Sequence, residues 1–146
     1  MIVPDINLLV YAYNSDAPYH SAARAWWEAL LNDEEPVALP WVCSLGFVRL
    51  MTHRSVLAQP LEPRAAVVHV RSWLERPNVG TLDPGPRHLE ILGRLLEHAG
   101  TAGNLTTDAH LAAIAIEHQC SLHSNDADFA RFQGLRWHNP LARDPD

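Results

Sequence analysis

The sequence contains no lysine, and its eleven cationic side chains are all arginines. Any contact with a phosphate must therefore use the planar guanidinium group, which binds two oxygens at once. Acidic side chains outnumber the arginines, and the formal net charge at pH 7 is -6. This balance argues against a broad nucleic-acid surface held by charge alone. It is compatible with a cation-binding cluster of acids, because such a cluster would itself contribute negative charge.

Long apolar stretches are also missing. No run approaches the roughly 20 residues of a membrane-spanning helix, and the start of the chain lacks the basic region and apolar run of a signal peptide. The two cysteines, Cys43 and Cys120, lie far apart without CxxC spacing, so neither a disulfide nor a cysteine metal site is expected. These absences together predict a reduced, cytoplasmic protein with no membrane partner.

Several nucleotide and metal motifs are absent as well. The sequence has no Walker A lysine motif and no G-x-G-x-x-G, so nothing in it supports nucleotide binding. The nine histidines are scattered, and no H-x₃-H or H-E-x-x-H pattern occurs. An aspartyl-phosphate hydrolase would place a second acid two residues after Asp5, where this chain has Asn7.

What the sequence does contain is short apolar segments that alternate with amphipathic ones. A chain of 146 residues suits one domain, 1–146, in which about 139–146 is a C-terminal tail. Short strands separated by helices predict an α/β fold with a mostly parallel sheet that is covered on both faces. Apolar spacing predicts strands at 2–4, 37–39, 78–82, 120–123 and 135–137, helices at 6–13, 19–32, 40–51, 63–75 and 107–118, and a further helix that starts at 84–86 and closes at Gly100.

Acidic residues stand where the carboxyl ends of two predicted strands would lie. Asp5 directly follows the first strand, and Asp126 and Asp128 follow the fourth. In an open parallel sheet, ligands bind outside the carboxyl ends of the strands. If these two strands are neighbours, Asp5 and Asp126 emerge side by side. Asp108 begins the helix that leads into the fourth strand, and a helix running antiparallel to that strand starts near the same edge.

Carboxylates that lie close together repel each other and resist ionisation unless a cation joins them. Mg²⁺ suits such an oxygen site, because it takes one or two carboxylates and shares a substrate's phosphate. Such a cation activates water and stabilises charge on phosphate, so these acids point to phosphodiester chemistry. Position alone leaves other roles open: Asp5 and Asp108 could each serve a helix start, and Asp126 with Asp128 fits an Asx turn.

Four segments carry a resemblance to a known family. They are DINLLVYA at 5–12, similar to D-x-N-x-L-x-x-A; TDAHLAAIA at 107–115, similar to D-A-x-L-A-A-x-A; SNDADFARF at 124–132, similar to S-x-D-x-D-F-x-x-F; and GLRWHNP at 134–140. Together they resemble the PIN-domain ribonucleases, and the last segment resembles the usual close of the VapC toxins within that family. The four segments occur in the family's order and at its separations over almost the whole chain.

The resemblance implies a three-layer PIN-like fold with about five parallel strands flanked by helices. It implies an endoribonuclease toxin that hydrolyses phosphodiesters of tRNA or rRNA with metal-activated water and uses Mg²⁺ or Mn²⁺. It also implies a VapB-like antitoxin that blocks the site, and a homodimer. By matching positions, the catalytic and metal-binding acids are Asp5, Asp108 and Asp126, and the supporting residues are Ser124, Asp128 and Asn7.

One position departs from the family pattern. The family usually has a glutamate three residues before an arginine in the helix after the second strand, and here Gly46 precedes Arg49 at that spacing. One fewer acid implies weaker metal binding, one metal in place of two, or a site completed only by RNA phosphates. The alternative function is therefore a catalytically weak or inactive PIN-like module that binds RNA or an antitoxin. Arg49, together with Arg24 and His20 on the helix 19–32, are candidates for those contacts.

Overall fold

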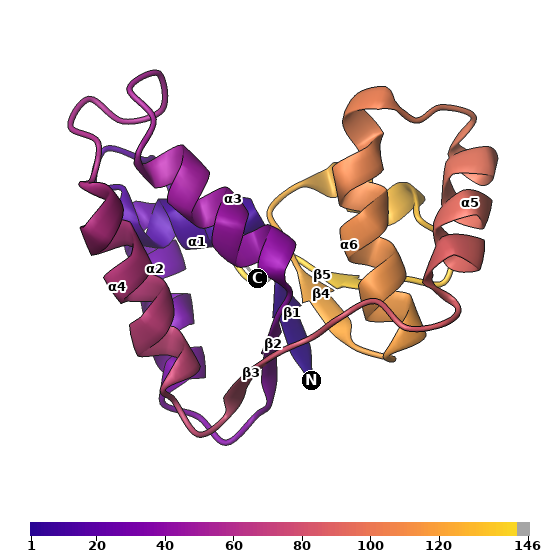
Figure 1. Ribbon diagram of the computed structural model, residues 1–146, viewed down its shortest axis with the longest axis horizontal. Helices are drawn as coiled ribbons and strands as arrows, with labels where there is room; N and C mark the ends of the chain where they lie inside the picture. Colours follow the sequence, from indigo (N-terminus) through magenta and orange to yellow (C-terminus); the bar gives the residue numbers. More distant parts are fainter. Residues whose placement is uncertain (143–146) are drawn as a thin grey trace.

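Five short strands form one parallel sheet at the centre of the computed structural model, which describes residues 1–142 (Figure 1). The strands are β1 (Ile2–Pro4), β2 (Val37–Leu39), β3 (Val79–Thr81), β4 (Ser121–His123) and β5 (Arg136–His138). Their order across the sheet is β3-β2-β1-β4-β5. The central strands β1 and β2 are almost wholly buried, because helices cover both faces of a parallel sheet. The predicted α/β fold with five parallel strands is confirmed.

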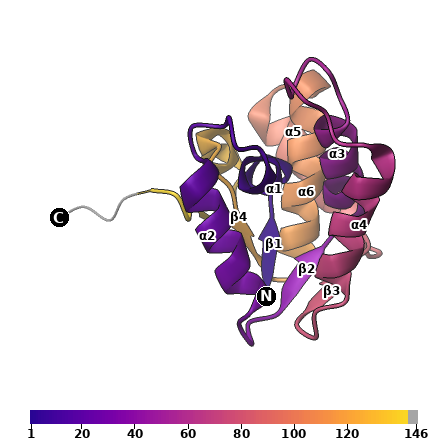
Figure 2. The same cartoon turned by 90° about the vertical axis from the view of Figure 1, so that its left-hand side faces the viewer.

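Six α-helices flank the sheet within residues 1–142, and Figure 2 shows α2 and α6 on opposite sides of β1. The helices are α1 (Ile6–Tyr13), α2 (His20–Leu31), α3 (Trp41–Met51), α4 (Pro63–Leu74), α5 (His88–Ala99) and α6 (Thr106–Glu117), with 3₁₀ turns η1 (Gly103–Leu105) and η2 (Ala127–Arg131). Each α-helix except α5 begins and ends within a residue or so of its predicted limits. The apolar spacing in the sequence therefore determines these helices well.

The start of α5 differs from the prediction, since the helix begins at His88 and not at 84–86. The carboxylate of Glu117 accepts hydrogen bonds from the backbone N–H groups of Gly85 and Arg87, each at 2.8 Å. These bonds hold the proline-rich segment as a turn ahead of the helix. A side chain that is distant in the sequence thus decides where α5 begins.

The end of α5 is as predicted, because Gly100 has a left-handed φ of 74° that glycine adopts without strain. Residues 139–142 of the predicted tail contain no helix or strand, and 143–146 lie outside the described residues. Among the residues that are described, no helix combines the length and apolar character needed to cross a membrane.

The pairing of β1 with β4 decides which residues meet at the carboxyl edge of the sheet. Pro4 lies opposite His123 in this parallel pair, and the backbone N–H of Asp5 donates a 2.8 Å hydrogen bond to the His123 carbonyl. Asp5 and Ser124 are therefore neighbours, because each directly follows the last residue of one of these two strands. The condition on which the sequence prediction rested, that the first and fourth strands are neighbours, is met.

Aromatic packing fixes the helices around α1. The Trp27 and Trp73 rings meet edge to face with centroids 5.4 Å apart, and Phe47 packs on Trp73 at 4.7 Å. The indole N–H of Trp73 donates to the hydroxyl of Tyr13 at 2.8 Å. These contacts join α1, α2, α3 and α4, so the helix that starts beside Asp5 is held by three others.

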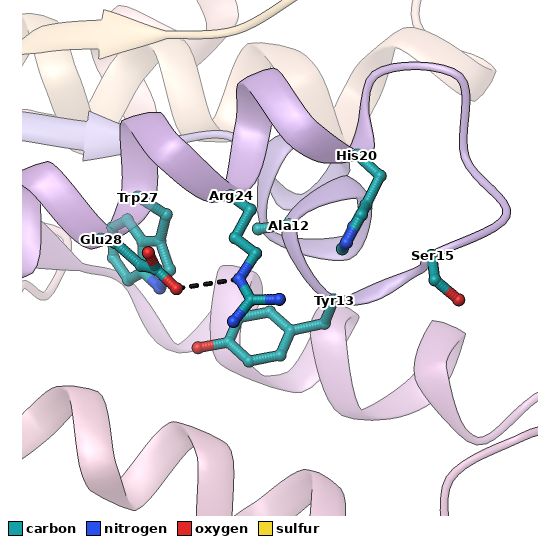
Figure 3. Close-up of a pocket in the computed structure, with 7 residues that line it drawn as sticks. All are labelled: Ala12, Tyr13, Ser15, His20, Arg24, Trp27 and Glu28. Carbon is teal, nitrogen blue, oxygen red and sulfur yellow. Dashed lines mark hydrogen bonds and ion pairs between the residues drawn. The ribbon is translucent and has the colours of Figure 1, made fainter.

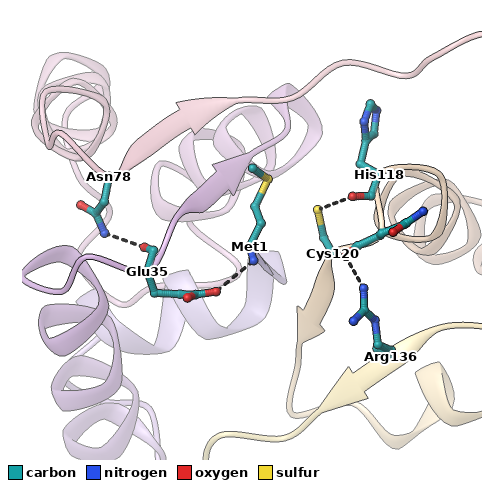
Figure 4. Close-up of polar contacts among 7 residues, drawn as sticks. Met1, Glu35, Asn78, His118, Cys120 and Arg136 are labelled. Carbon is teal, nitrogen blue, oxygen red and sulfur yellow. Dashed lines mark hydrogen bonds and ion pairs between the residues drawn. The ribbon is translucent and has the colours of Figure 1, made fainter.

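The opposite edge of the sheet is closed by polar contacts between turns (Figure 4). The N-terminal amino group pairs with the Glu35 carboxylate at 2.9 Å, and the Asn78 amide donates to the Glu35 carbonyl at 3.0 Å. Arg136 donates to the carbonyl of Gln119 on the other side of β1. These contacts hold the turns at this edge of the sheet together.

Candidate metal and active site

Asp5 is the most buried acid at the carboxyl edge, with 5% of its surface exposed. Its Oδ1 accepts a 2.8 Å hydrogen bond from the backbone N–H of Ile6, and its Oδ2 accepts a 2.7 Å bond from the hydroxyl of Ser124. Burial, aided by the negative charges of Asp108 and Asp126, raises the pKa of Asp5 to about 6 despite these two bonds. Asp5 does cap α1, but two further acids act on its charge.

Ser124 is fully buried and joins two of the predicted site acids. Its hydroxyl donates to Asp5 and accepts a 2.9 Å hydrogen bond from the backbone N–H of Asp126. Its own backbone is fixed to β5, because its N–H donates to the His138 carbonyl at 3.0 Å and its carbonyl accepts from the Trp137 indole at 3.0 Å. One hydroxyl therefore sets the positions of Asp5 and the Asp126 turn together.

Asp108 lies in the first turn of α6, whose last turn leads through a short connection into β4. The side chain is half-buried, and burial followed by repulsion from Asp126 and Asp128 raises its pKa. Within residues 1–142 its carboxylate accepts no hydrogen bond from the α6 backbone. Asp108 therefore makes no cap bond, although its place in the first turn suits the helix dipole. The repulsion from Asp126 and Asp128 shows that it lies near the same edge as those acids.

Asp126 and Asp128 form the turn that the Asx alternative describes. The Oδ1 of Asp126 accepts a 2.8 Å hydrogen bond from the backbone N–H of Asp128. Asp128 is exposed and pairs with Arg131 at 3.3 Å. The turn bond uses one carboxylate oxygen of Asp126, and the negative charge of Asp126 contributes to the raised pKa values of Asp5 and Asp108.

The three acids lie at one edge of the sheet but do not form a closed cage. Within residues 1–142, no three His, Cys, Asp or Glu side chains are arranged closely enough to hold a metal ion as they stand. The donors are all carboxylate oxygens, which suit hard divalent cations and not zinc. After burial, the charges of Asp108 and Asp126 add to the raised pKa of Asp5, and those of Asp126 and Asp128 add to the raised pKa of Asp108; a cation would relieve this repulsion. Donor chemistry and electrostatics therefore fit a divalent cation.

A profile of the PIN domain matches residues 2–135 of this chain. The chain belongs to the PIN-domain family. Ribonuclease VapC33 of Mycobacterium tuberculosis is 48% identical over 141 residues, which are 97% of this chain and 99% of that protein. Ribonuclease VapC37 of the same species is 42% identical over 142 residues, with 97% and 99% covered. These identities place the chain in the VapC branch of PIN-domain proteins.

Solved structures agree on the fold. The structure of VapBC-1 from nontypeable Haemophilus influenzae matches with a TM-score of 0.70 and 15% identity, over 97% of this chain and 100% of that chain. At such low identity the likeness concerns the fold alone. The PIN-like fold that the sequence motifs imply is thereby confirmed.

The family resemblance aligns Gly46 with a glutamate, and the structure shows which side chain lies beside Gly46. Gly46 is buried on α3 and lines a pocket of about 360 Å³ with Ile6, Leu45 and Thr107 among its neighbours. A Cβ added at Gly46 would lie 2.6 Å from Cδ1 of Ile6. The side chain that follows Asp5 in the sequence thus occupies the volume that a larger residue at 46 would need.

The three candidate contact residues divide between two pockets. Arg49 lines the Gly46 pocket, which reaches Thr107 beside Asp108. Arg24 and His20 line a separate pocket of about 310 Å³ with Tyr13 and Trp27 (Figure 3). The two side chains therefore lie on one face of α2. Neither residue lies in a pocket with the site acids.

Both α2 candidates have partners inside the chain. Arg24 pairs with Glu28 at 2.9 Å, and both side chains are largely exposed. His20 donates from Nδ1 to the carbonyl of Tyr11 at 2.8 Å, because a carbonyl can only accept. Arg49 has no ion pair within the described residues. The structure therefore favours Arg49 over Arg24 as a group available to a ligand near the acids.

Sequence reasoning missed Tyr11 and Asn125, which line a polar pocket with Asn7 and Asp126. Burial and the negative charges of Asp5 and Asp126 raise the pKa of Tyr11. A signal for Tyr11 existed, because it follows Asn7 by four residues and so shares its face of α1. Asn7 itself is exposed and lines this pocket with Asp126.

Proposed function

We propose that this chain is a metal-dependent endoribonuclease toxin that hydrolyses RNA phosphodiesters with activated water. The observation that carries the proposal is Asp5, a carboxylate held by two hydrogen bonds, whose pKa is raised by burial and further by the charges of Asp108 and Asp126. Perturbed acids of this kind cluster at functional sites. The ribonucleases VapC33 and VapC37, which share almost the full length of this chain, support the same activity.

Asp5 and Asp108 are the residues that would hold Mg²⁺ or Mn²⁺, and Asp126 would bind a second ion or orient the attacking water. A bound divalent cation supplies activated water and offsets charge on the phosphate. Mg²⁺ keeps several waters and shares phosphate oxygens, so it seldom needs an all-protein cage. Three acids lie at this edge without forming a closed cage within the described residues. This open arrangement is compatible with the coordination that Mg²⁺ prefers.

In this proposal, Ser124 positions the carboxylate of Asp5 and the turn that carries Asp126. It donates to Asp5 and accepts from the backbone of Asp126, so it favours the ionised form of Asp5 and fixes the turn that carries the third acid. Asp5 must be ionised to bind a cation. Because its pKa is about 6, activity should rise as the pH increases through that value.

Arg49 is the residue we assign to phosphate contact. It lines the pocket that ends at Thr107, the neighbour of Asp108, and its guanidinium is suited to bidentate phosphate binding. A VapB-like antitoxin would block the same edge. The paired VapBC-1 assembly from Haemophilus influenzae, which shares this fold, supports such a partner. A homodimer and a tRNA or rRNA target complete the proposal.

The second candidate function is a PIN-like module that binds RNA or an antitoxin and cleaves poorly. The observation in its favour is Gly46, which leaves α3 without a carboxylate at this position and has the side chain of Ile6 beside it. With fewer acids, the site would bind a cation more weakly. The two functions differ in turnover and not in partners.

The decisive experiment incubates purified, partner-free protein with structured RNA in Mg²⁺ or Mn²⁺. We expect cleavage that stops with chelator and falls at least about 100-fold in Asp5→Asn, since charge stabilisation at the reacting phosphate is lost. Asp33→Asn is the matched control, because Asp33 is an exposed acid in the turn after α2. Equal cleavage by wild type and Asp5→Asn would show that the activity does not come from this site. RNA binding without chelator-sensitive cleavage would favour the second function.

A further inference from the structure

A small polar pocket lies directly beside Asp126. Its volume is about 270 Å³, and it is lined by Asn7, Tyr11, Asn125, Asp126 and Ala127. We propose that this pocket binds one base of the RNA substrate next to the cleaved phosphodiester, with its edge bound by Asn125. The base would stack on Tyr11, which lines the pocket, and on the exposed ring of Tyr19, which packs against Tyr11 just outside that lining. The inference rests on the proposed ribonuclease function and adds to it a site for base recognition.

The pocket shares its walls with the candidate catalytic edge. Asp126 belongs to both, and Asn7 lies on α1 two residues after Asp5. Tyr11 is one helical turn further along the same face of α1. A nucleotide whose phosphate meets the acids would therefore have this pocket within reach of its own base or of its neighbour's.

Tyr11 and Tyr19 form an aromatic pair on which a base can stack. Their ring centroids are 5.6 Å apart with planes tilted by 43°, and Tyr19 is 46% exposed. The hydrogen bond from His20 to the Tyr11 carbonyl holds the start of α2 against α1. Neither tyrosine hydroxyl forms a hydrogen bond within residues 1–142. Aromatic stacking contributes roughly 1–3 kcal/mol per base in single-stranded complexes.

Asn125 can recognise the edge of a stacked base. Its side-chain amide offers donors and an acceptor, and none of them is used within the described residues. The backbone on both sides is fixed, because Ser124 N–H donates to His138 at 3.0 Å and Asp126 N–H donates to Ser124 Oγ at 2.9 Å. RNA-binding proteins bind splayed-out bases by this combination of stacking and edge hydrogen bonds.

Charge favours a base in this pocket over a phosphate or an apolar side chain. The Asp126 carboxylate forms part of the wall and would repel a phosphate, whereas a base is neutral. By contrast, Val67, Val70 and Leu74 line an apolar groove beside Trp41 on α3, which suits a protein segment better. The polar pocket beside Asp126 therefore suits a nucleotide, and the apolar groove beside Trp41 suits a protein segment.

The first test measures binding in chelator, so that cleavage is not needed. The probes are a short single-stranded RNA of mixed sequence and its abasic counterpart, which has the same backbone charge. Wild type should bind the abasic strand about 10-fold more weakly, and Tyr19→Ala and Asn125→Ala should largely lose this discrimination. Tyr19→Phe should retain it, because the ring is kept. Trp41→Ala is the control, since Trp41 is a 50% exposed aromatic away from the pocket.

The second test maps the cut site and replaces each flanking base in turn by an abasic position. One replacement should lower kcat/KM of wild type about 10-fold and change Tyr19→Ala by less than about 2-fold. Discrimination that survives in both alanine variants overturns the base pocket. So does a Tyr19→Ala variant that loses antitoxin binding while it keeps base discrimination. If wild type cuts no RNA yet discriminates in binding, the proposed activity fails and the base pocket stands.

Discussion

The two sides of Asp5 are built in different ways. On the β4 side, Ser124 bonds the carboxylate and at the same time holds the Asp126 turn. On the α3 side, Gly46 and Ile6 bring apolar surface up to the residue, and the Cys43 thiol donates to the Pro4 carbonyl at 3.3 Å. Burial, together with the negative charge of Asp5, raises the pKa of Cys43 and keeps the thiol neutral.

The difference shows how a buried acid can be kept ready for a cation with few partners. The Ser124 hydroxyl on the polar side and the backbone N–H of Ile6 donate the hydrogen bonds that favour the charged form, and the apolar side adds burial, which opposes it. Burial is the larger effect, since the pKa of Asp5 rises to about 6. The site therefore holds an acid whose charge is costly until a cation or a proton reaches it.

The largest expected effect follows from that cost. Because the folded pKa of Asp5 is raised from 3.8 to about 6, the folded state binds more protons than the unfolded state between those values. The free energy of unfolding should then fall by up to about 3 kcal/mol as the pH rises from about 4 to about 6. Asp5→Asn should remove this decline and be more stable than wild type at neutral pH. Urea unfolding across that pH range measures both.

Two controls sharpen the stability comparison. Asp33→Asn, which changes an exposed acid, should keep the wild-type pH dependence. Mn²⁺ at neutral pH should stabilise wild type more than Asp5→Asn, because only the carboxylate gains from the cation. A wild-type protein whose stability is flat between pH 4 and 6 would mean that Asp5 is not a strained acid, and the contrast between its two sides would lose its basis.

A smaller effect is expected from Ser124→Ala, which removes the polar side's hydroxyl. Hydrogen bonds to charged groups contribute about 1.5–3 kcal/mol, so the variant should lose stability of that order at neutral pH. The pKa of Asp5 should move above its present value, and the rising limb of the pH–rate profile should move with it. Ser72→Ala is the matched control, because Ser72 is exposed and its hydroxyl bonds only a carbonyl of its own helix. An unmoved pH limb would show that Ser124 does not favour the ionised acid.

The β4 side of the site was largely predictable from the sequence. Short apolar strands predict a parallel sheet, and acids that directly follow two of them predict an edge at which Asp5 and Asp126 meet. Only the adjacency of β1 and β4 remained conditional, and the pairing of Pro4 with His123 meets that condition. The family motif placed Ser124 as a supporting residue, and it bonds both Asp5 and the turn.

The α3 side could not be predicted, because it depends on distances and not on patterns. The sequence motif shows that Gly46 stands in place of an acid, but only the folded structure shows that Ile6 fills the space beside it. The same holds for the start of α5, which the distant Glu117 sets. Periodicity reports the face on which a residue lies; it does not report which side chain from another element reaches that face.

The smallest expected effect comes from giving the α3 side the acid that it lacks. Gly46→Glu alone must push Ile6 aside, since the new Cβ would lie 2.6 Å from its Cδ1, and overpacking of this kind costs about 1–3 kcal/mol. With Ile6→Ala added, the space is free and the glutamate can reach the acids. We expect this double variant to bind Mn²⁺ about 10-fold more tightly than wild type, because affinity follows the number of carboxylate ligands. Isothermal titration calorimetry measures the change.

The control for this double variant is Gly46→Gln with Ile6→Ala, because glutamine has the size of glutamate without its charge. If the glutamine pair binds Mn²⁺ as tightly as the glutamate pair, the gain comes from the space that Ile6 leaves and not from a new ligand. If the glutamate pair binds more tightly and also cleaves RNA faster, then the wild-type site is limited by its missing acid. Tighter binding without faster cleavage would instead mean that the acids of the β4 side suffice for the chemistry, and that Ile6 and Gly46 set only how strongly the cation is held.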